Sequence, residues 1–379
     1  MWLMETYQRL PVRFVKGKGV YLYDEKGKRY LDLVSGIAVN ALGYGDRDQV
    51  KAICHQAKKL IHVSNLFENP WQEKLAKLLV ERFWTKGRVF FCNSGTEANE
   101  AAIKLVRRYF RLRGEDRYRI ITFQNSFHGR TFGSMSATAQ KKIQTGFEPL
   151  LEGFDYAIFN DISSVEKLIT DKTAAVMLEI VQGEGGVRVA DRQFLEDLQK
   201  LCRERGLLLL LDEVQTGIGR TGKFYAYQHF QLEPDIITLA KGLGGGVPIG
   251  ALLAREEVAK AFDAGSHGST FGGNPLACAS ALVVVEKVSE LLDHVREVGE
   301  YFMERLAALG RGEVRGMGLM LALELESNCK EVVLKALEKG LVINCTAKKV
   351  LRFVPPLILQ KRHVDIAVRI LRRVLEEVG

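Results

Sequence analysis

Short apolar runs alternate with segments of helical periodicity through the middle of the chain. The runs typical of β-strands cover residues 89–91, 119–123, 174–179, 207–212 and 235–239. Between two of them, residues 192–205 place Leu195, Leu198, Leu201 and Cys202 on one face of a predicted helix. Strands that alternate with helices predict a mainly parallel sheet covered by helices, and therefore an α/β fold.

The two ends of the chain have a different pattern. Residues 20–32 predict a β-hairpin with a glycine-containing turn at 24–28. The further elements that we expect are helices at 46–60 and 70–83, two long helices between Pro275 and about residue 310, a strand at 318–324 and a helix at 364–378. No internal repeat is visible.

This change of pattern predicts two domains built from three segments. Residues 46–275 would form a large domain around the sheet. Residues 1–45 and 276–379 would together form a smaller α+β domain.

The composition is that of an ordinary globular protein, with 47% hydrophobic and 26% charged residues. No apolar stretch approaches the roughly 18–20 residues that a membrane span needs. The first residues, Met1 to Thr6, lack the basic and apolar regions of a signal peptide. We therefore expect a cytoplasmic protein that does not enter a membrane.

The cysteines are scattered and form no CxxC pair. They are Cys54, Cys92, Cys202, Cys278, Cys329 and Cys345. This spacing predicts reduced thiols rather than a disulfide framework or a metal site. Cys92 could be read as a nucleophile, but the apolar neighbours Val89, Phe90 and Phe91 favour a buried structural cysteine.

The formal net charge of +8 raises the possibility of nucleic-acid binding. Lys and Arg are spread along the chain, however, and usually alternate with Asp and Glu. The densest basic stretch, residues 107–113, resembles the end of an amphipathic helix, where cations are favourable. A positive field would also attract small dianions such as phosphates and dicarboxylates. The charge pattern therefore favours small anionic ligands over nucleic acid.

Two of the apolar runs end in residues that can carry chemistry. The run at 207–211 ends in Asp212, and the run at 235–239 is followed by Lys241 and the glycine-rich segment 242–246. The carboxyl ends of parallel strands lie together, and ligands bind there. Pyridoxal phosphate (PLP) requires an amine that bonds to its aldehyde and a carboxylate that binds its pyridinium nitrogen. The alternatives are a surface lysine and an aspartate in a structural salt bridge.

A candidate phosphate site follows the predicted strand at 89–91. Ser94 and Glu97 have the spacing of a capping box, and Gly95 allows a ligand to approach the backbone. The free N–H groups and the dipole of a helix N-terminus attract anions. Simple helix capping is the alternative interpretation.

The motifs that carry a family resemblance occur in order along the chain. They are 93–101 (NSGTEANEA), 126–131 (SFHGRT), 182–186 (QGEGG), 212–217 (DEVQTG), 240–242 (AKG) and 269–275 (STFGGNP). Together they resemble the class III PLP-dependent aminotransferases, and the resemblance spans nearly the whole chain. Residues 7–11, 35–40, 242–250 and 352–357 are most similar to members that act on N-acetylornithine in arginine biosynthesis.

The resemblance implies PLP-dependent transferase fold type I. Such a fold has a large domain with a seven-stranded, mainly parallel sheet and a smaller domain made from both chain ends. The resemblance also implies a homodimer with shared active sites.

The same resemblance implies roles for individual residues around PLP. Lys241 would bond to the aldehyde, and Asp212 would bind the ring nitrogen. The other cofactor contacts would be Ser94, Gly95 and Thr96 at the phosphate, Phe127 and Val214 on the two ring faces, Gln215 at the ring hydroxyl, and Thr270 at the phosphate in the neighbouring subunit.

Substrate binding is implied for Arg130, Glu184, Ser269 and Arg352. Arg130 would bind the carboxylate distal to the reacting amine. Arg352 would bind the α-carboxylate of glutamate or 2-oxoglutarate, since guanidinium pairs bidentately with carboxylate. Glu184 would pair with Arg352 when N-acetylornithine is bound and move aside for glutamate.

One segment departs from the family pattern. Where the family usually has Gly-His-x-His-Pro, residues 43–48 read GYGDRD. This difference leaves the implied PLP contacts unchanged. It concerns the implied dimer contacts near these residues and the assignment of the substrate.

Several related activities share every PLP contact. The amino donor could also be ornithine, succinylornithine, 4-aminobutyrate or a carrier-linked lysine, and an aminomutase is a further possibility. A different class of function is a basic nucleic-acid-binding protein on a retired enzyme scaffold. The presence of Lys241, Asp212 and Thr96 argues against that reading.

Overall fold

The computed structural model describes residues 2–81 and 86–378 of the chain. Within these residues the largest sheet has seven strands in the order β4-β12-β11-β10-β7-β5-β6. Their bounds are β4 Gly87–Cys92, β12 Gly250–Arg255, β11 Ile236–Leu239, β10 Leu208–Asp212, β7 Thr173–Leu178, β5 Arg119–Phe123 and β6 Phe154–Ala157. The strands from β11 to β6 are parallel, and β12 runs antiparallel to both β11 and β4. The predicted α/β fold with a mainly parallel sheet is confirmed.

Strand β10 shows why the sheet needs cover on both faces. Leu208 and Leu210 belong to one hydrophobic cluster, whereas Leu209 and Leu211 belong to the other. Successive side chains of a strand point to opposite faces, so a run of leucines requires a helix layer on each side. Helix α4 (Gly95–Leu112) covers one face and helix α8 (Arg192–Arg205) covers the other.

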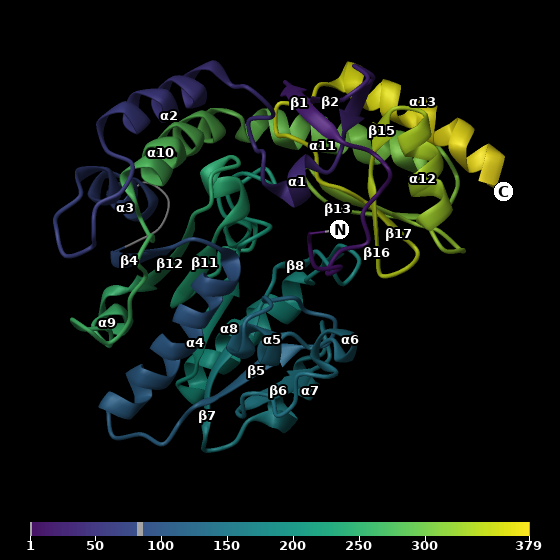
Figure 1. The fold of residues 1–379 in the computed structure, drawn as a ribbon. Helices are drawn as coiled ribbons and strands as arrows, with labels where there is room; N and C mark the ends of the chain where they lie inside the picture. The colour runs from purple at the N-terminus through teal and green to yellow at the C-terminus, as the bar shows by residue number, and fades with distance from the viewer. Residues whose placement is uncertain (1, 82–85, 379) are drawn as a thin grey trace.

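Both ends of the chain build the other body of the molecule (Figure 1). Strands β1 (Phe14–Lys18), β2 (Tyr21–Asp24) and β3 (Arg29–Asp32) form a sheet with β15 (Leu341–Val342), which pairs parallel with β3. A neighbouring antiparallel sheet has the order β13-β14-β17-β16 within the described residues. Its strands are β13 Glu313–Met317, β14 Met320–Glu324, β17 Val350–Phe353 and β16 Asn344–Thr346.

The remaining elements connect or cover these sheets. The helices are α1 Ser35–Ala38, α2 Arg47–Lys59, α3 Pro70–Glu81, α5 Phe132–Ala137, α6 Lys141–Gln144, α7 Ile162–Leu168, α9 Glu256–Ala259, α10 Pro275–Glu290, α11 Leu292–Ala307, α12 Lys330–Glu338 and α13 Lys361–Val378. Two 3₁₀ turns, η1 Ala226–His229 and η2 Lys241–Gly244, and the short strands β8 Val181–Gln182 and β9 Arg188–Val189 complete the described part. No helix among the described residues has the length and apolar character to cross a membrane.

Most predicted elements are present with small shifts at their ends. The expected strand at 318–324 begins only at Met320, because Gly318 and Leu319 form the turn from β13. The expected helix at 70–83 is α3, and its last two positions lie outside the described residues. Strands β6 and β12 were not predicted from the sequence.

The prediction of six reduced cysteines is wrong for two of them. Cys329 and Cys345 form a disulfide, with their Cα atoms 5.8 Å apart. Helix α12 and strand β15 lie between them in sequence, and the chain then returns along β16 to the start of α12. This proximity is tertiary, so cysteine spacing alone did not reveal it. The other cysteines, all in the described part of the chain, are free: Cys54, Cys92, Cys202 and Cys278.

Candidate active site

A cavity of about 370 Å³ opens at the carboxyl ends of β10 and β11, beside the first turn of α4. Nine of the site residues expected from the sequence line it. They are Ser94, Gly95, Thr96, Phe127, Arg130, Asp212, Val214, Gln215 and Lys241. Glu184, Ser269, Thr270 and Arg352 are not among its lining residues.

Lys241 begins the 3₁₀ turn η2, directly after strand β11 and Ala240. Its φ of 43° lies in the left-handed region, which costs a residue with a Cβ about 1–2 kcal/mol. Burial of the amine lowers its pKa below the ordinary lysine value, and Glu184 is the strongest influence in the opposite direction. A lysine with a lowered pKa is closer to the neutral, nucleophilic form.

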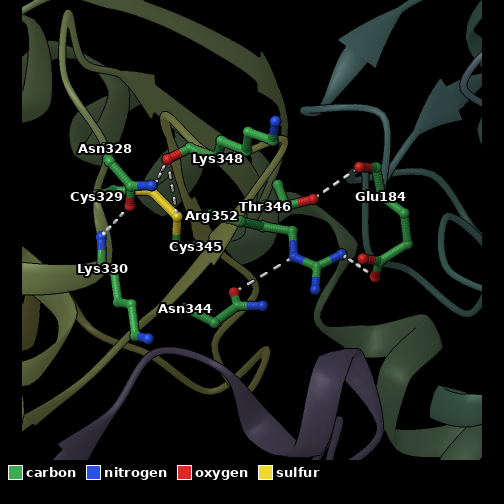
Figure 2. The surroundings of a disulfide bond; sticks show 9 residues. All are labelled: Glu184, Asn328, Cys329, Lys330, Asn344, Cys345, Thr346, Lys348 and Arg352. Carbon is green, nitrogen blue, oxygen red and sulfur yellow. Dashed lines mark hydrogen bonds and ion pairs between the residues drawn. A yellow bond between two sulfur atoms is a disulfide. The ribbon is translucent and has the colours of Figure 1, made fainter. Parts of the chain in front are cut away.

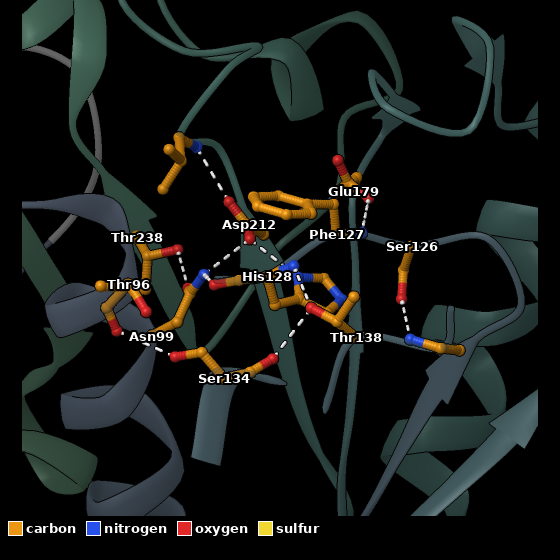
Figure 3. Close-up of polar contacts among 12 residues, drawn as sticks. Thr96, Asn99, Ser126, Phe127, His128, Ser134, Thr138, Glu179, Asp212 and Thr238 are labelled. Carbon is orange, nitrogen blue, oxygen red and sulfur yellow. Dashed lines mark hydrogen bonds and ion pairs between the residues drawn. The ribbon is translucent and has the colours of Figure 1, made fainter. Parts of the chain in front are cut away.

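Asp212 ends strand β10 and is 4% exposed. Its Oδ2 accepts a hydrogen bond from Nδ2 of Asn99 at 2.8 Å and lies 2.8 Å from Nδ1 of His128. Its Oδ1 accepts from the backbone N–H of Val214 at 3.0 Å (Figure 3). The carboxylate therefore has partners from three different segments and is fixed in orientation. None of these partners is the arginine of the alternative interpretation.

The partners of Asp212 are themselves held in place. The amide oxygen of Asn99 accepts from the Thr238 hydroxyl at 2.7 Å, and its Nδ2 also donates to the carbonyl of His128 at 2.7 Å. The backbone N–H of His128 donates to Oγ1 of Thr138 at 2.8 Å. These contacts join α4, β11 and the loop before α5 into one polar network under the cavity (Figure 3).

Sequence reasoning assigned no role to Asn99 or His128. Asn99 follows Thr96 by three residues, so the two share one face of α4 and both line the cavity. The three-residue spacing from Thr96 could therefore have identified Asn99 as a site residue. The position of His128 depends on the packing of its loop against β10, which the sequence pattern does not encode.

Ser94 is the N-cap of α4, and its Oγ accepts from the N–H of Glu97 at 3.3 Å. The Glu97 carboxylate reaches back to the N–H of Asn93 at 2.6 Å, one residue before the position of a standard capping box. The predicted cap is therefore present in a shifted form. A Cβ on Gly95 would lie 2.6 Å from Cγ1 of Val214, so only glycine fits between the helix start and Val214.

Thr96 organises the loop that follows Phe127. Its Oγ1 accepts from the N–H groups of Arg130 and Thr131 at 3.1 and 3.2 Å. The guanidinium of Arg130 lies 5.8 Å from the centre of the Phe127 ring, at the exposed edge of the cavity. An exposed arginine at this edge is available to a ligand carboxylate.

Glu179, a further residue without a predicted role, follows directly after β7 and supports Phe127. Its Oε2 accepts from the backbone N–H of Phe127 at 3.0 Å. Burial raises the pKa of Glu179 to about 7, with His128 acting to lower it and Asp212 to raise it. The Glu179 carboxyl group therefore holds a proton more readily than an exposed glutamate does.

Arg352 and Glu184 form an ion pair close to the cavity. Arg352 lies on β17 and is 1% exposed, and its Nη1 donates to Oε1 of Glu184 at 2.5 Å. Nη1 also lies 3.3 Å from Oε1 of Gln215, a residue of the cavity wall. Burial acts to raise the pKa of Glu184, but Arg352 outweighs it and the pKa is lowered. The Glu184 carboxylate is thus ionised at neutral pH.

Ser269 and Thr270 lie away from the cavity of their own chain. Oγ of Ser269 accepts from Nδ2 of Asn93 at 3.1 Å and from the N–H of Gly272 at 3.0 Å. Thr270 is exposed on the surface. Ser269 is therefore anchored to Asn93, the residue before the N-cap of α4, and the Thr270 side chain that follows is exposed.

Known proteins similar to this chain belong to one enzyme family. The family model for aminotransferase class-III matches residues 3–375. The acetylornithine aminotransferase of Aquifex aeolicus is 64% identical over 99% of this chain and 100% of its own length. The corresponding protein of Methanocaldococcus jannaschii is 51% identical over 99% of this chain and 96% of its own.

Solved structures agree over the whole fold. The ornithine aminotransferase of Toxoplasma gondii superposes with a TM-score of 0.95 at 32% identity, covering 100% of this chain and 93% of that one. The N-acetylornithine aminotransferase of Stenotrophomonas maltophilia gives a TM-score of 0.85 at 39% identity, with 98% and 97% covered. The family and the fold type implied by the sequence motifs are confirmed: this chain belongs to the class III aminotransferases.

Proposed function

We propose that the protein is a PLP-dependent N-acetylornithine:2-oxoglutarate aminotransferase of arginine biosynthesis. It would convert N-acetylornithine and 2-oxoglutarate into N-acetylglutamate 5-semialdehyde and glutamate in a ping-pong cycle. The observation that carries the proposal is the single cavity in which Lys241, Asp212 and the N-terminus of α4 meet. The names of the relatives described above favour N-acetylornithine as the amino donor.

The residues of the cavity fit PLP. The volume of about 370 Å³ lies within the range of ligand pockets. The first turn of α4 has backbone N–H groups without an intrahelical acceptor at Gly95 and Thr96, and a phosphate would bind them beside Ser94. Phe127 and Val214 would enclose the ring, Gln215 would contact its hydroxyl group, and Asp212 would face its nitrogen. When bound, PLP supplies a protonated ring that withdraws electrons from the carbon next to the transferred nitrogen.

Lys241 would hold PLP covalently in the resting enzyme and then act as a base and an acid. Its desolvated amine would remove a proton from the substrate carbon that bears the nitrogen and return it to the carbon on the other side of that nitrogen. Asp212 would keep the proton on the ring nitrogen, because Asn99, His128 and Val214 hold its carboxylate in one orientation.

Two arginines would position the substrates. Arg130 at the cavity edge would bind the carboxylate distal to the reacting amine, with Ser269 as a further substrate contact. Arg352 would bind the α-carboxylate of glutamate or 2-oxoglutarate. The ion pair with Glu184 would neutralise Arg352 while N-acetylornithine is bound, since this substrate presents no carboxylate at that position.

The active form would be a homodimer in the cytoplasm. Exposed Thr270 would reach the phosphate in the neighbouring subunit, so each site would need both chains. Within each chain, we assign residues 46–275 to the large domain and residues 1–45 and 276–379 to the small one. The pairing of β3 with β15 supports this division. Residues 1 and 379 lie outside the described residues.

The test is a coupled assay of the purified protein with N-acetylornithine and 2-oxoglutarate. Lys241→Ala should abolish turnover, whereas Lys260→Ala, which removes an exposed lysine, should retain it. Borohydride treatment of the resting enzyme should attach the cofactor to the peptide that contains Lys241. A panel with ornithine, succinylornithine, 4-aminobutyrate and carrier-linked lysine then ranks the donors. Faster turnover of one of these than of N-acetylornithine would overturn the substrate assignment.

A further inference from the structure

The Cys329–Cys345 disulfide lies next to the ion pair of Arg352 and Glu184 (Figure 2). Cys345 is the middle residue of β16, between Asn344 and Thr346. Asn344 contacts Arg352, and Thr346 contacts the backbone of Glu184. The disulfide therefore joins the start of α12 to the strand that supports Arg352.

Asn344 contacts Arg352 in two ways. The two residues are register partners in the β16–β17 ladder. The Asn344 amide also lies within hydrogen-bond distance of the Arg352 guanidinium in either orientation of the amide, at 3.3 or 2.7 Å. A displacement of β16 would therefore move a direct partner of the guanidinium.

Thr346 contacts the other member of the pair. Its hydroxyl donates to the backbone carbonyl of Glu184 at 2.7 Å. Thr346 is buried, and this bond connects β16 to the loop between β8 and β9. Strand β16 therefore contacts Arg352 through Asn344 and the backbone of Glu184 through Thr346.

The turn after β16 depends on an external anchor. Ala347 and Lys348 have φ values of 47° and 68°, which residues with a Cβ disfavour. The carbonyl of Lys348 accepts from the N–H of Cys329 at 3.0 Å. The disulfide attaches β16 to the start of α12 and this bond attaches the following turn to it, so the loss of the disulfide removes the covalent one of these two restraints.

We propose that Cys329 and Cys345 are positioning residues whose disulfide holds β16 so that Arg352 and Glu184 are aligned for the α-carboxylate of 2-oxoglutarate and glutamate. The inference rests on the proposed function. With the disulfide intact, the protein binds these dicarboxylates more tightly than with two thiols. The half-reaction with N-acetylornithine depends much less on the disulfide, because its carboxylate would bind Arg130 on a different loop and the Arg352–Glu184 pair needs only to stay closed.

The two forms interconvert by thiol–disulfide exchange with an external dithiol. Cys345 is half-buried, and Cys329 is fully buried, so the attack occurs at the Cys345 sulfur. The Sγ–Sγ bond breaks as a mixed disulfide forms, and the second thiol of the reagent then releases Cys345. The dithiol loses two electrons and becomes a disulfide, and both protein sulfurs end as thiols.

The experiment compares the oxidised holoenzyme, the holoenzyme treated with dithiothreitol, and the Cys329→Ser/Cys345→Ser variant. The two half-reactions are followed separately, with N-acetylornithine and with 2-oxoglutarate. We expect reduction or the double substitution to raise the KM for 2-oxoglutarate about three- to tenfold, with a smaller change for N-acetylornithine. Amide hydrogen exchange across residues 344–353 should become faster, and reoxidation should reverse both effects.

Two controls separate the disulfide from other thiols. The exposed free thiol is removed by Cys54→Ser, which should leave the response to dithiothreitol unchanged. The double variant should not respond to dithiothreitol. An equal loss in both half-reactions, or unchanged hydrogen exchange at 344–353 after verified reduction, would overturn the inference. If N-acetylornithine is no substrate in either form, the proposed function fails, and hydrogen exchange together with 2-oxoglutarate affinity still decides the role of the disulfide.

Discussion

Asn99 donates a hydrogen bond of 2.8 Å to Asp212 across 113 residues of sequence. The bond joins the second turn of α4, whose first turn carries the candidate phosphate site, to the end of β10. The helix that would bind one end of the cofactor therefore also orients the carboxylate at the other end.

Replacing Asn99 with Ala should lower kcat about tenfold and change KM values much less. The Asp212 carboxylate would lose one of its two partners on Oδ2 and be held less firmly by the two contacts that remain. Steady-state kinetics and the absorbance spectrum of the bound cofactor measure the effect. Asp212→Asn sets the upper limit, with a loss of at least about 100-fold, since it removes the charge itself. Wild-type kcat in Asn99→Ala would refute the positioning role.

Replacing Glu184 with Ala should alter the balance between the two half-reactions. Arg352 would remain charged and unpaired in the presence of N-acetylornithine, and this half-reaction should slow about tenfold. The half-reaction with glutamate should change little, because its α-carboxylate can replace Glu184. Single-turnover measurements with each amino donor test this ratio. An equal effect on both donors would show that Glu184 does not discriminate between them.

Replacing Gly95 with Ala should weaken cofactor binding about tenfold or more. The new methyl group would lie 2.6 Å from Cγ1 of Val214, so the start of α4 must shift. Titration of the apoprotein with PLP gives the dissociation constant. Val214→Ala removes the clashing atoms, and the double variant should therefore bind PLP better than the sum of the single effects predicts. Strict additivity would contradict a clash between these two residues.

Replacing Lys241 with Met should stabilise the apoprotein at neutral pH. Burial lowers the pKa of this amine, so the folded state binds fewer protons than the unfolded state between the lowered pKa and the usual value of about 10.4. The penalty from the buried amine is complete below the lowered pKa and disappears as pH rises toward 10.4. The Tm gain should thus be about 2 °C at pH 7 and smaller at pH 10. Lys260→Met is the matched control, with no gain at either pH.

The strands of the seven-stranded sheet that the sequence predicted are the ones with apolar runs. β10 and β7 are buried along their whole length, so a simple apolar run identified them and placed Asp212 at a strand end. β12 was missed because Gly250 and Ala251 follow a glycine-rich segment, and its identity as a strand depends on pairing with β4 and β11. β6 was missed because it has four residues and Asp155 interrupts its apolar pattern.

The candidate site was predictable where motif order carried information. Lys241 and Asp212 could be named because each follows an apolar run typical of a buried strand, and Thr96 and Arg352 because the resemblance fixed their positions. Asn99, His128 and Glu179 were not assigned because they act through other residues, and their contacts arise only when distant segments pack together. The disulfide was missed for the same reason.

The parallel pairing of β3 with β15 has a consequence for biosynthesis. On the ribosome, the N-terminal hairpin emerges early, but its partner strand is made only near the end of translation. Until then the edge of β3 remains unpaired, and exposed strand edges promote aggregation. A nascent chain of this protein should therefore be a chaperone client until late in its synthesis.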